Sequence, residues 1–337
     1  MSEAPMPASD PSPVDPISPR PSRRARLREQ APVAKFLFAW NRIAPFFVSA
    51  ALFLSGFFAV FSPLPFLILG VTVGGWWLVG ALATNSALVY FTSGSTVFQF
   101  YLLTVGSIGL VMPLLIRRRF RPEQIVARTW IVQWCLVGIL ICVYALLHGV
   151  TPFAELKAIF SSFFDVLFAS LSDETRKQLL ESFGGGELAV SEWRRRTLVE
   201  LPGTLGILCL LVAWFNLRVL INLNPNRFLV RVGLDRRVLN RWKNPDWLVW
   251  PTVASWAIVL FTDGRPSEIC LNIFKILMAA YGLQGIAIFG TIFEAWKIRG
   301  PFRMILYAIL IMIMLPLPLS FGFFDQWFDF RSKFRQS

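Results

Sequence analysis

Long stretches of apolar residues without a single charge constrain this chain more than any other feature. Residues 44–62, 66–92 and 97–116 contain no Asp, Glu, Lys or Arg. A helix that spans a bilayer needs about 20 consecutive apolar residues, and several such stretches cannot be buried in one globular core. Charged residues make up only 16% of the chain, against about 25% in soluble domains. We therefore predict an all-α, polytopic bundle of transmembrane helices.

Apolar runs of spanning length, interrupted by charges and prolines, predict about seven to eight membrane segments, some of them short or broken. The predicted segments are 44–62, 66–92, 97–116, 124–148, 199–222, 247–262, 268–296 and 302–324. Gly74 and Gly75 interrupt the second segment, which we interpret as a short half-helix followed by a longer one. One long tilted helix is the alternative. Pro316 and Pro318 interrupt the last segment.

Basic residues predict the orientation, because cytoplasmic loops of membrane proteins carry an excess of Lys and Arg. They cluster at 117–121, 223–246 and 297–303, and the net charge is +13. We predict a cytoplasmic N-terminus and location in a bacterial inner membrane. Three full crossings would place the arginines of 117–121 outside, which is why we favour a break at Gly74-Gly75. The side of the C-terminus stays open, because its basic residues favour the cytoplasm and the span count favours the outside.

The predicted domain organisation has one membrane domain, 35–330, between two tails. Residues 1–34 are rich in Pro and Arg and are predicted to form a disordered cytoplasmic tail. Residues 331–337 are predicted to form a short basic tail. Within the membrane domain, 150–197 has apolar residues at helical spacing and predicts a solvated amphipathic insertion at the outer interface.

Several function classes lack support in the sequence. A basic net charge is found in nucleic-acid-binding proteins, but here the basic residues lie in short loops beside apolar runs, so we predict no nucleic-acid partner. The four cysteines form no C-x-x-C pair and His148 is the single histidine, so we predict no metal site. Neither a phosphate-binding P-loop nor a catalytic constellation is found. We expect a protein that is not an enzyme and has no cofactor.

Polar residues on the predicted helix 268–296 are the candidate ligand-binding groups. Glu268, Asn272 and Lys275 stand at i, i+4 and i+7 and therefore share one helix face. Tyr281 and Gln284 lie close together on another face. Polar groups inside a span are expected to be functional. The alternative is structural: Glu268 and Lys275 pair with each other or reach the surface, and Gln284 bonds a neighbouring helix.

Three motifs in the C-terminal half carry a family resemblance: Asn244–Pro251, Tyr281–Ala287 and Phe321–Arg331. In this order they resemble the YybS-like family of bacterial membrane proteins, a domain of unknown function, over roughly residues 40–325. That family is similar to the S components of energy-coupling-factor vitamin transporters. The resemblance implies about six helices and a small-molecule site near the outer face. It also implies partners, namely a transmembrane coupling subunit and ATPases, besides the lipid bilayer. The N-terminal tail, the 150–197 insertion and the extra segments depart from a minimal S component.

Two hypotheses for function follow. The first is a vitamin-like small-molecule binding or uptake subunit that resembles an S component and lacks its own ATPase. The second is a membrane scaffold or assembly factor that binds cytoplasmic partners through its basic loops.

Overall fold

A computed structural model describes residues 44–182, 187–223, 229, 232–234, 238–298 and 300–335. Ala44–Ser337 form one unit by their contacts, and Met1–Ile43 are assigned to another. The predicted tail 1–34 and part of the predicted loop 223–246 lie outside the described residues.

Every regular element among the described residues is a helix, as the apolar periodicity predicts. The elements of the first half are η1 (Ala44–Phe46), α2 (Val48–Leu54), η2 (Ala59–Phe61), α3 (Leu64–Thr72), α4 (Gly75–Tyr101), the π-helix η3 (Leu102–Gly106), α5 (Ser107–Arg117), α6 (Pro122–His148), α7 (Pro152–Ser170) and α8 (Asp173–Ser182). The elements of the second half are α9 (Glu187–Leu223), η4 (Val238–Arg241), η5 (Asp246–Leu248), α11 (Val249–Phe261), α12 (Arg265–Ala295), α13 (Pro301–Met312), α14 (Pro316–Phe328) and α15 (Phe330–Arg335).

Four of these helices, by length and composition, can cross a membrane. They are Gly75–Arg117, Pro122–His148, Ser191–Leu223 and Arg265–Ala295. The pair α13 and α14 makes a fifth candidate if the two count as one bent span. The predicted all-α transmembrane bundle is confirmed, whereas the count of seven to eight segments stays a prediction.

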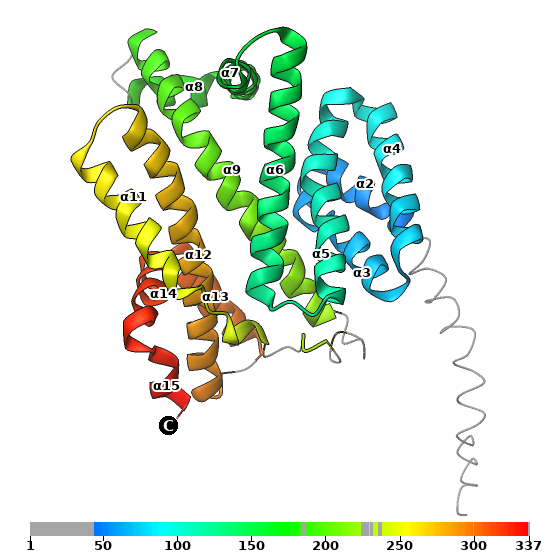
Figure 1. Cartoon of the computed structure of the whole chain (residues 1–337). Helices are drawn as coiled ribbons and strands as arrows, with labels where there is room; N and C mark the ends of the chain where they lie inside the picture. The colour runs from blue at the N-terminus through cyan, green and yellow to red at the C-terminus, as the bar shows by residue number, and fades with distance from the viewer. Residues whose placement is uncertain are drawn as a thin grey trace, which may run out of the picture. The chain divides into compact units, whose positions relative to one another are not determined.

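The first of these spans, Gly75–Arg117, is folded back on itself at Gly94. Gly94 has a φ of 83°, which lies outside the helical region and suits a residue without a side chain. A Cβ added to Gly106 would lie 3.3 Å from a Leu82 methyl carbon, and the rings of Tyr90 and Phe98 are 5.7 Å apart. In both pairs, the two residues lie equally far from Gly94 along the sequence, one on each side. In a straight helix, Leu82 and Gly106 would be separated by about 36 Å. The two halves of this span therefore lie antiparallel (Figure 1).

The length of this span explains why it folds back. Its 43 residues would extend about 65 Å as one straight helix, twice the hydrocarbon thickness of about 30 Å. Divided at Gly94, the segments 75–93 and 95–117 measure about 28 and 35 Å. Each segment matches the bilayer. The gap between the predicted segments 66–92 and 97–116 is thus the turn of a helical hairpin.

The segment 44–62, predicted as one span, is instead a series of short helices, the longest of which is α2. Non-helical backbone inside a membrane protein requires hydrogen-bond partners from the protein itself. Asn85, buried on α4, supplies two of them. Its Oδ1 accepts from the Ala50 amide at 2.8 Å, and its Nδ2 donates to the Pro45 carbonyl at 2.7 Å. Ser49 adds a bond from its hydroxyl to the Ser62 carbonyl at 2.7 Å.

The helix break expected at Gly74 and Gly75 separates α3 from α4. Gly74 has a φ of 122°, a conformation that only glycine adopts readily, and Gly75 is the first residue of α4. Arg117 fixes the turn, because its Nε donates to the Gly70 carbonyl at 3.0 Å. The α3–α4 turn and the end of α5 therefore lie at the same end of the bundle.

We call this end of the bundle the basic end. It carries the α5–α6 connection with Arg117–Arg121, and the end of α12, which Lys297 follows (Figure 1). It also carries η4 with Arg241, because Asn240 of η4 bonds Glu294 near the end of α12 at 2.6 Å. The opposite end carries α7 and α8, where acidic and basic residues are mixed. Because α7 appears end-on while α6 and α9 appear side-on, α7 lies across the ends of these helices. Thr151 caps it, accepting a hydrogen bond from the Ala154 amide.

The last apolar segment bends by 89° between α13 and α14. Pro316 is the first residue of α14, and Pro318 lies in its first turn. The bend returns the chain to the basic end. There Arg331 of α15 donates to the Trp242 carbonyl. Residues 330–335, predicted mostly as a tail, form the helix α15.

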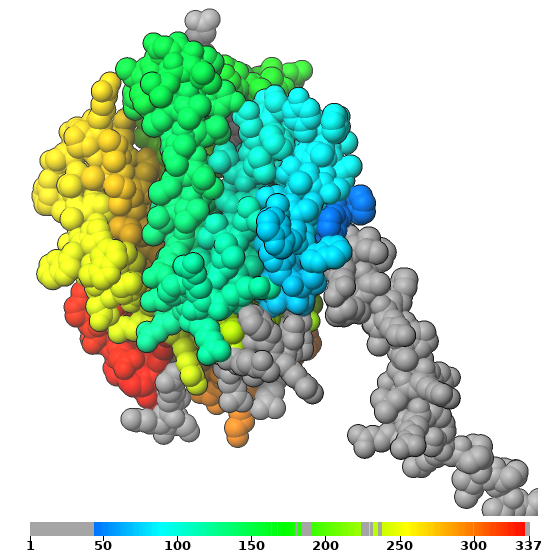
Figure 2. All heavy atoms as spheres, turned by 45° about the vertical axis from the view of Figure 1, so that its right-hand side comes forward, coloured from blue at the N-terminus to red at the C-terminus, as the bar shows by residue number. Residues whose placement is uncertain are grey.

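The main hydrophobic core surrounds α9, which packs against α3, α6 and α12. It is formed by buried aliphatic residues such as Leu67, Ile125, Leu217 and Leu283. Helix α6 is the least covered span, with 11% of its most apolar window buried. It stands forward as a ridge in Figure 2. The middle of α6 exposes apolar side chains such as Ile131, Leu136, Ile139 and Val143, as expected for a surface that faces lipid.

Candidate functional site

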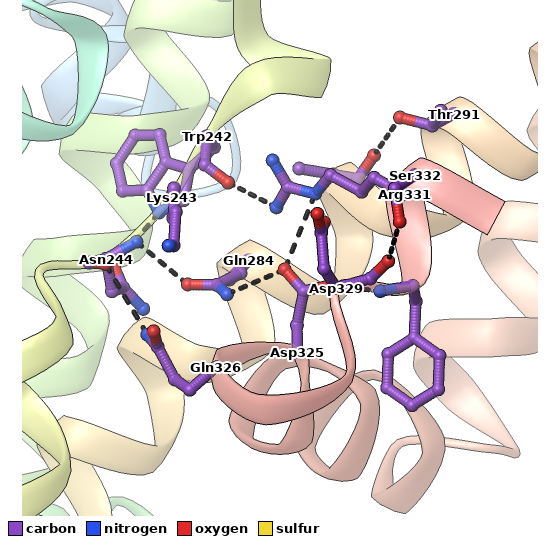
Figure 3. A network of polar contacts seen from close by, with 12 residues as sticks. Trp242, Lys243, Asn244, Gln284, Thr291, Asp325, Gln326, Asp329, Arg331 and Ser332 are labelled. Atoms are coloured by element: carbon purple, nitrogen blue, oxygen red, sulfur yellow. Dashed lines mark hydrogen bonds and ion pairs between the residues drawn. The ribbon is translucent and has the colours of Figure 1, made fainter. Parts of the chain in front are cut away.

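The three motifs that carry the family resemblance meet in one network of buried polar side chains at the basic end (Figure 3). Asn244 precedes α11, Gln284 belongs to α12, and Asp325 belongs to α14. Their exposed fractions are 5%, 0% and 4%. Buried polar side chains are expensive unless they are hydrogen-bonded, so their partners decide what the network does.

Gln284 is the centre of the network. Its Oε1 accepts a hydrogen bond from the backbone N–H of Asn244 at 2.8 Å, and its Nε2 donates to Asp325 Oδ2 at 3.1 Å. Asn244 extends the network: its Nδ2 donates to the Ala280 carbonyl at 2.9 Å, and its Oδ1 accepts from the Trp242 indole at 3.1 Å. The Gln284 side chain thus connects three parts of the chain: helix α12, to which it belongs, helix α14, and the segment that precedes α11.

A buried ion pair completes the network. Arg331 Nε lies 3.6 Å from Asp325 Oδ2, and the arginine also donates to the Trp242 carbonyl. Asp325 Oδ1 accepts from the Phe330 amide at 2.9 Å. Both charged side chains are almost fully buried. A buried charge persists when it is paired and hydrogen-bonded, as both are here.

Two glycines allow α12 and α14 to approach closely enough for these contacts. A Cβ added to Gly285 would overlap the Pro318 carbonyl, and a Cβ added to Gly322 would overlap the Tyr281 carbonyl. Small residues of this kind are typical of helix contacts in membranes. The close crossing brings Asp325 within reach of Gln284.

The other predicted ligand residues on α12 lie toward the opposite end and contact α9. Glu268 pairs with Arg195 at 3.1 Å, and Lys275 pairs with Glu200 at 2.6 Å. Between these ion pairs, Asn272 bridges two backbone groups of α9. Its Oδ1 accepts from the Gly203 amide at 2.7 Å, and its Nδ2 donates to the Val199 carbonyl at 2.8 Å.

The Asn272 bridge is explained by the proline of α9. Gly203 N and Val199 O occupy i and i−4 positions, where a regular helix would bond them to each other. Pro202 lies inside α9, and a proline disturbs the helical hydrogen bonds of the preceding turn. The Asn272 amide satisfies both groups. A Cβ at Gly203 would overlap Asn272 Oδ1.

Tyr281, predicted beside Gln284, is fully buried and packs edge-on against Phe323 at 5.2 Å. It belongs to the α12–α14 contact, whereas Glu268, Asn272 and Lys275 belong to the α9–α12 contact. The structure therefore divides the five predicted residues between two places on α12. Gly74 and Gly75 lie at the α3–α4 turn, and Pro316 and Pro318 lie at the start of α14.

Asn244, Asp325 and Arg331 were part of the recognised motifs but were absent from the predicted site. An acidic residue just after an apolar run was the available signal for Asp325. Among the described residues, no group of three or more His, Cys, Asp or Glu side chains is placed to hold a metal ion. The network joins amide, carboxylate and guanidinium groups, which together fix the arrangement of these helices.

Apolar spans around a buried polar network define an integral membrane protein of the α-helical class. The chain belongs to the family described as Predicted membrane protein (DUF2232), whose profile matches residues 43–326. The prediction of a membrane-protein family with a domain of unknown function is confirmed. No curated protein and no solved structure matches the chain. The YybS-like assignment and the similarity to S components stay predictions.

Proposed function

We propose that this protein is a non-enzymatic subunit that binds a small charged solute for uptake and depends on separate proteins for energy. The observation that carries the proposal is the group of charged side chains between α9 and α12, in the half of the bundle away from the basic end. Ionisable residues within spans are functional candidates. Two interrupted segments, 44–72 and 301–328, also support it, since discontinuous helices are typical of transporter binding sites.

The charges between α9 and α12 are paired but still accessible. Glu268 and Lys275 have side chains that are 34% and 30% exposed, and their partners Arg195 and Glu200 are 58% and 48% exposed. Exposed ion pairs are worth little to stability, so a ligand with charges of both signs can replace them at small cost. We infer a zwitterionic or similarly charged vitamin-like solute, which enters from the end that carries α7.

The orientation follows from the basic end. Under the positive-inside rule, the basic end faces the cytoplasm of a bacterial inner membrane, and the charges between α9 and α12 face the outside. Energy would come from a transmembrane coupling subunit and ATPases. The sequence has no P-loop of its own, which is compatible with such partners.

Thermal-shift measurements on the purified full chain test the proposal. A panel of vitamins, amino acids and metal ions would be screened for ligands that raise the melting temperature. The shift should disappear in Glu268→Gln and Lys275→Gln. It should persist in Glu294→Gln, a matched control on the same helix that pairs with Arg303 at the basic end. A panel without any stabilising ligand, or a shift that all three variants keep, contradicts the proposal.

A scaffold for cytoplasmic partners is the second candidate, and the concentration of arginine and lysine at the basic end favours it. Cross-linking from Arg118→Cys in native membranes separates the two candidates. Capture of one soluble protein that lacks ATPase activity, in the absence of any stabilising solute, favours the scaffold. Co-purification of ATPases with the full chain favours the uptake subunit.

A further inference from the structure

An aromatic cleft lies between α14 and α15 at the basic end, and the proposed function does not use it. The cleft has a volume of about 210 Å³, and its lining atoms are apolar. The residues that line it are Ser320, Phe321, Phe324, Phe328 and Phe330. Four phenylalanine rings around one cleft suit a flexible hydrocarbon better than a polar solute.

The shape of the cleft is fixed by the buried network. Asp329, with a φ of 38°, forms a left-handed turn that folds α15 back against α14. Asp325 holds the start of α15 through the Phe330 amide. The Phe330 ring then lies 4.9 Å from that of Phe321 and 5.8 Å from that of Phe328. The Phe330 wall of the cleft is therefore held in place by the hydrogen bond from its backbone amide to Asp325.

The cleft is open at the surface of the bundle, in apolar surroundings. Phe324 and Phe328 are 47% and 54% exposed, and the neighbouring Trp327 is 58% exposed. Exposed tryptophan is typical of the level where lipid headgroups begin. Helix α13, which precedes α14, exposes apolar side chains such as Met304 and Met312. An apolar surface of this kind suits contact with membrane lipid.

A positive charge stands at the rim of the cleft. Lys333 Nζ lies 5.9 Å from the ring centroids of both Phe328 and Phe330. A lysine at a membrane interface extends along apolar surface while its ammonium group reaches the headgroups. A ligand that matches both the apolar cleft and the lysine at its rim has a hydrocarbon chain with a negatively charged headgroup at one end.

We propose that the cleft binds one acyl chain of an anionic phospholipid, with the lipid phosphate beside Lys333. Basic residues near a bilayer surface attract anionic lipids, and the aromatic walls supply the apolar contact. This inference stands independently of the solute proposed above, because it concerns different residues at the opposite end of the bundle.

Native mass spectrometry of the full chain tests the charge of the lipid. Phosphatidylglycerol should be retained more strongly than phosphatidylcholine. Lys333→Gln should weaken retention of phosphatidylglycerol about fivefold, the loss expected for one basic residue. Lys177→Gln, on α8 at the other end, is the matched control and should leave retention unchanged. Equal retention of the two lipids, or equal loss in both variants, overturns the proposal.

Photo-cross-linking tests the identity of the occupant in native membranes. A benzoylphenylalanine introduced at the exposed position Phe328 should yield an adduct of phospholipid mass. Introduced at Phe302, which is 59% exposed on α13, it should yield less of that adduct. An adduct of protein size at Phe328 would show that a partner helix occupies the cleft and would overturn the lipid assignment.

Discussion

Replacing Asp325 by asparagine removes the carboxylate that faces Arg331 while keeping the size of the side chain. Asn Oδ1 can still accept from the Phe330 amide. Its NH₂ group, however, would take the place of Oδ2, which accepts from Gln284 Nε2 at 3.1 Å and lies 3.6 Å from Arg331 Nε. The NH₂ group of the new asparagine would then face two other donors, Gln284 Nε2 and Arg331 Nε. Gln284 cannot exchange its Oε1 and Nε2 by rotating its side-chain amide, because Oε1 already accepts from the backbone N–H of Asn244.

The expected cost follows from burial. Arg331 is 8% exposed, so Asp325→Asn removes the carboxylate that faces a buried guanidinium. Breaking a buried ion pair in this way costs about 3–5 kcal/mol. Asp246→Asn is the matched control, because the Lys243–Asp246 pair has side chains that are 54% and 78% exposed. Exposed pairs contribute about 0–1 kcal/mol.

Unfolding of the purified protein in mixed micelles, followed by circular dichroism, would measure the free energy of unfolding of both variants. The double variant Asp325→Leu, Arg331→Met should lose less stability than Asp325→Asn, because it removes both members of the buried ion pair. A loss below about 1 kcal/mol for Asp325→Asn, or a double variant that is less stable than the single one, would refute this account of the network.

Two further predictions concern the helix contacts on α12. Gly285→Ala should destabilise the protein by about 1–3 kcal/mol or more, the cost of overpacking, because the added Cβ meets the Pro318 carbonyl. The control is Gly138→Ala on α6, where an added Cβ has no neighbour within 4 Å. This control should be neutral or stabilising in the same unfolding assay. Asn272→Ala should cost about 1–2 kcal/mol, because two backbone groups of α9 lose their partner; retention of wild-type stability would mean that the Pro202 turn does not need the bridge.

Much of the helical organisation could be predicted from hydropathy and turn residues. The spans 124–148, 199–222 and 268–296 correspond to α6, the membrane part of α9, and α12. Gly74-Gly75 marked a break because glycine tolerates positive φ. These features depend on residues close together in the sequence, so local patterns contain the information.

The segment 44–62 shows what local patterns cannot supply. Its composition fits a membrane span, but the backbone is divided into short helices whose open groups bond to Asn85 and Ser49. Asn85 is distant in the sequence, and its single amide fits ordinary helix packing equally well. Only the fold shows which backbone groups it satisfies.

The candidate site was predictable only in part for the same reason. Helical spacing correctly grouped Glu268, Asn272 and Lys275 on one face, yet their partners on α9 lie about 70 residues away in sequence. Asn244 and Asp325 each lie about 40 residues from Gln284. Spacing along one helix cannot reveal which distant segments pack against it. The role of these residues in ligand binding stays a prediction.

The bend between α13 and α14 also settles which end of the bundle the C-terminal helix occupies. The number of predicted membrane crossings put the C-terminus on the side opposite Arg117–Arg121. The basic residues near the C-terminus favoured the same side as Arg117–Arg121. Because the chain turns by 89°, 301–328 does not run straight across the bundle. Arg331 consequently reaches the Trp242 carbonyl at the basic end.

Cysteine labelling at the Gly94 turn tests whether this is a membrane protein whose span Gly75–Arg117 is a hairpin. The background would have its native cysteines replaced, namely Cys135, Cys142, Cys209 and Cys270. With an impermeant maleimide on intact cells, Ser95→Cys should react, and Arg118→Cys should react only after permeabilisation. A continuous helix would place residue 95 near the bilayer centre. Failure of Ser95→Cys to react from either side, or its reaction from the same side as Arg118→Cys, would contradict the hairpin.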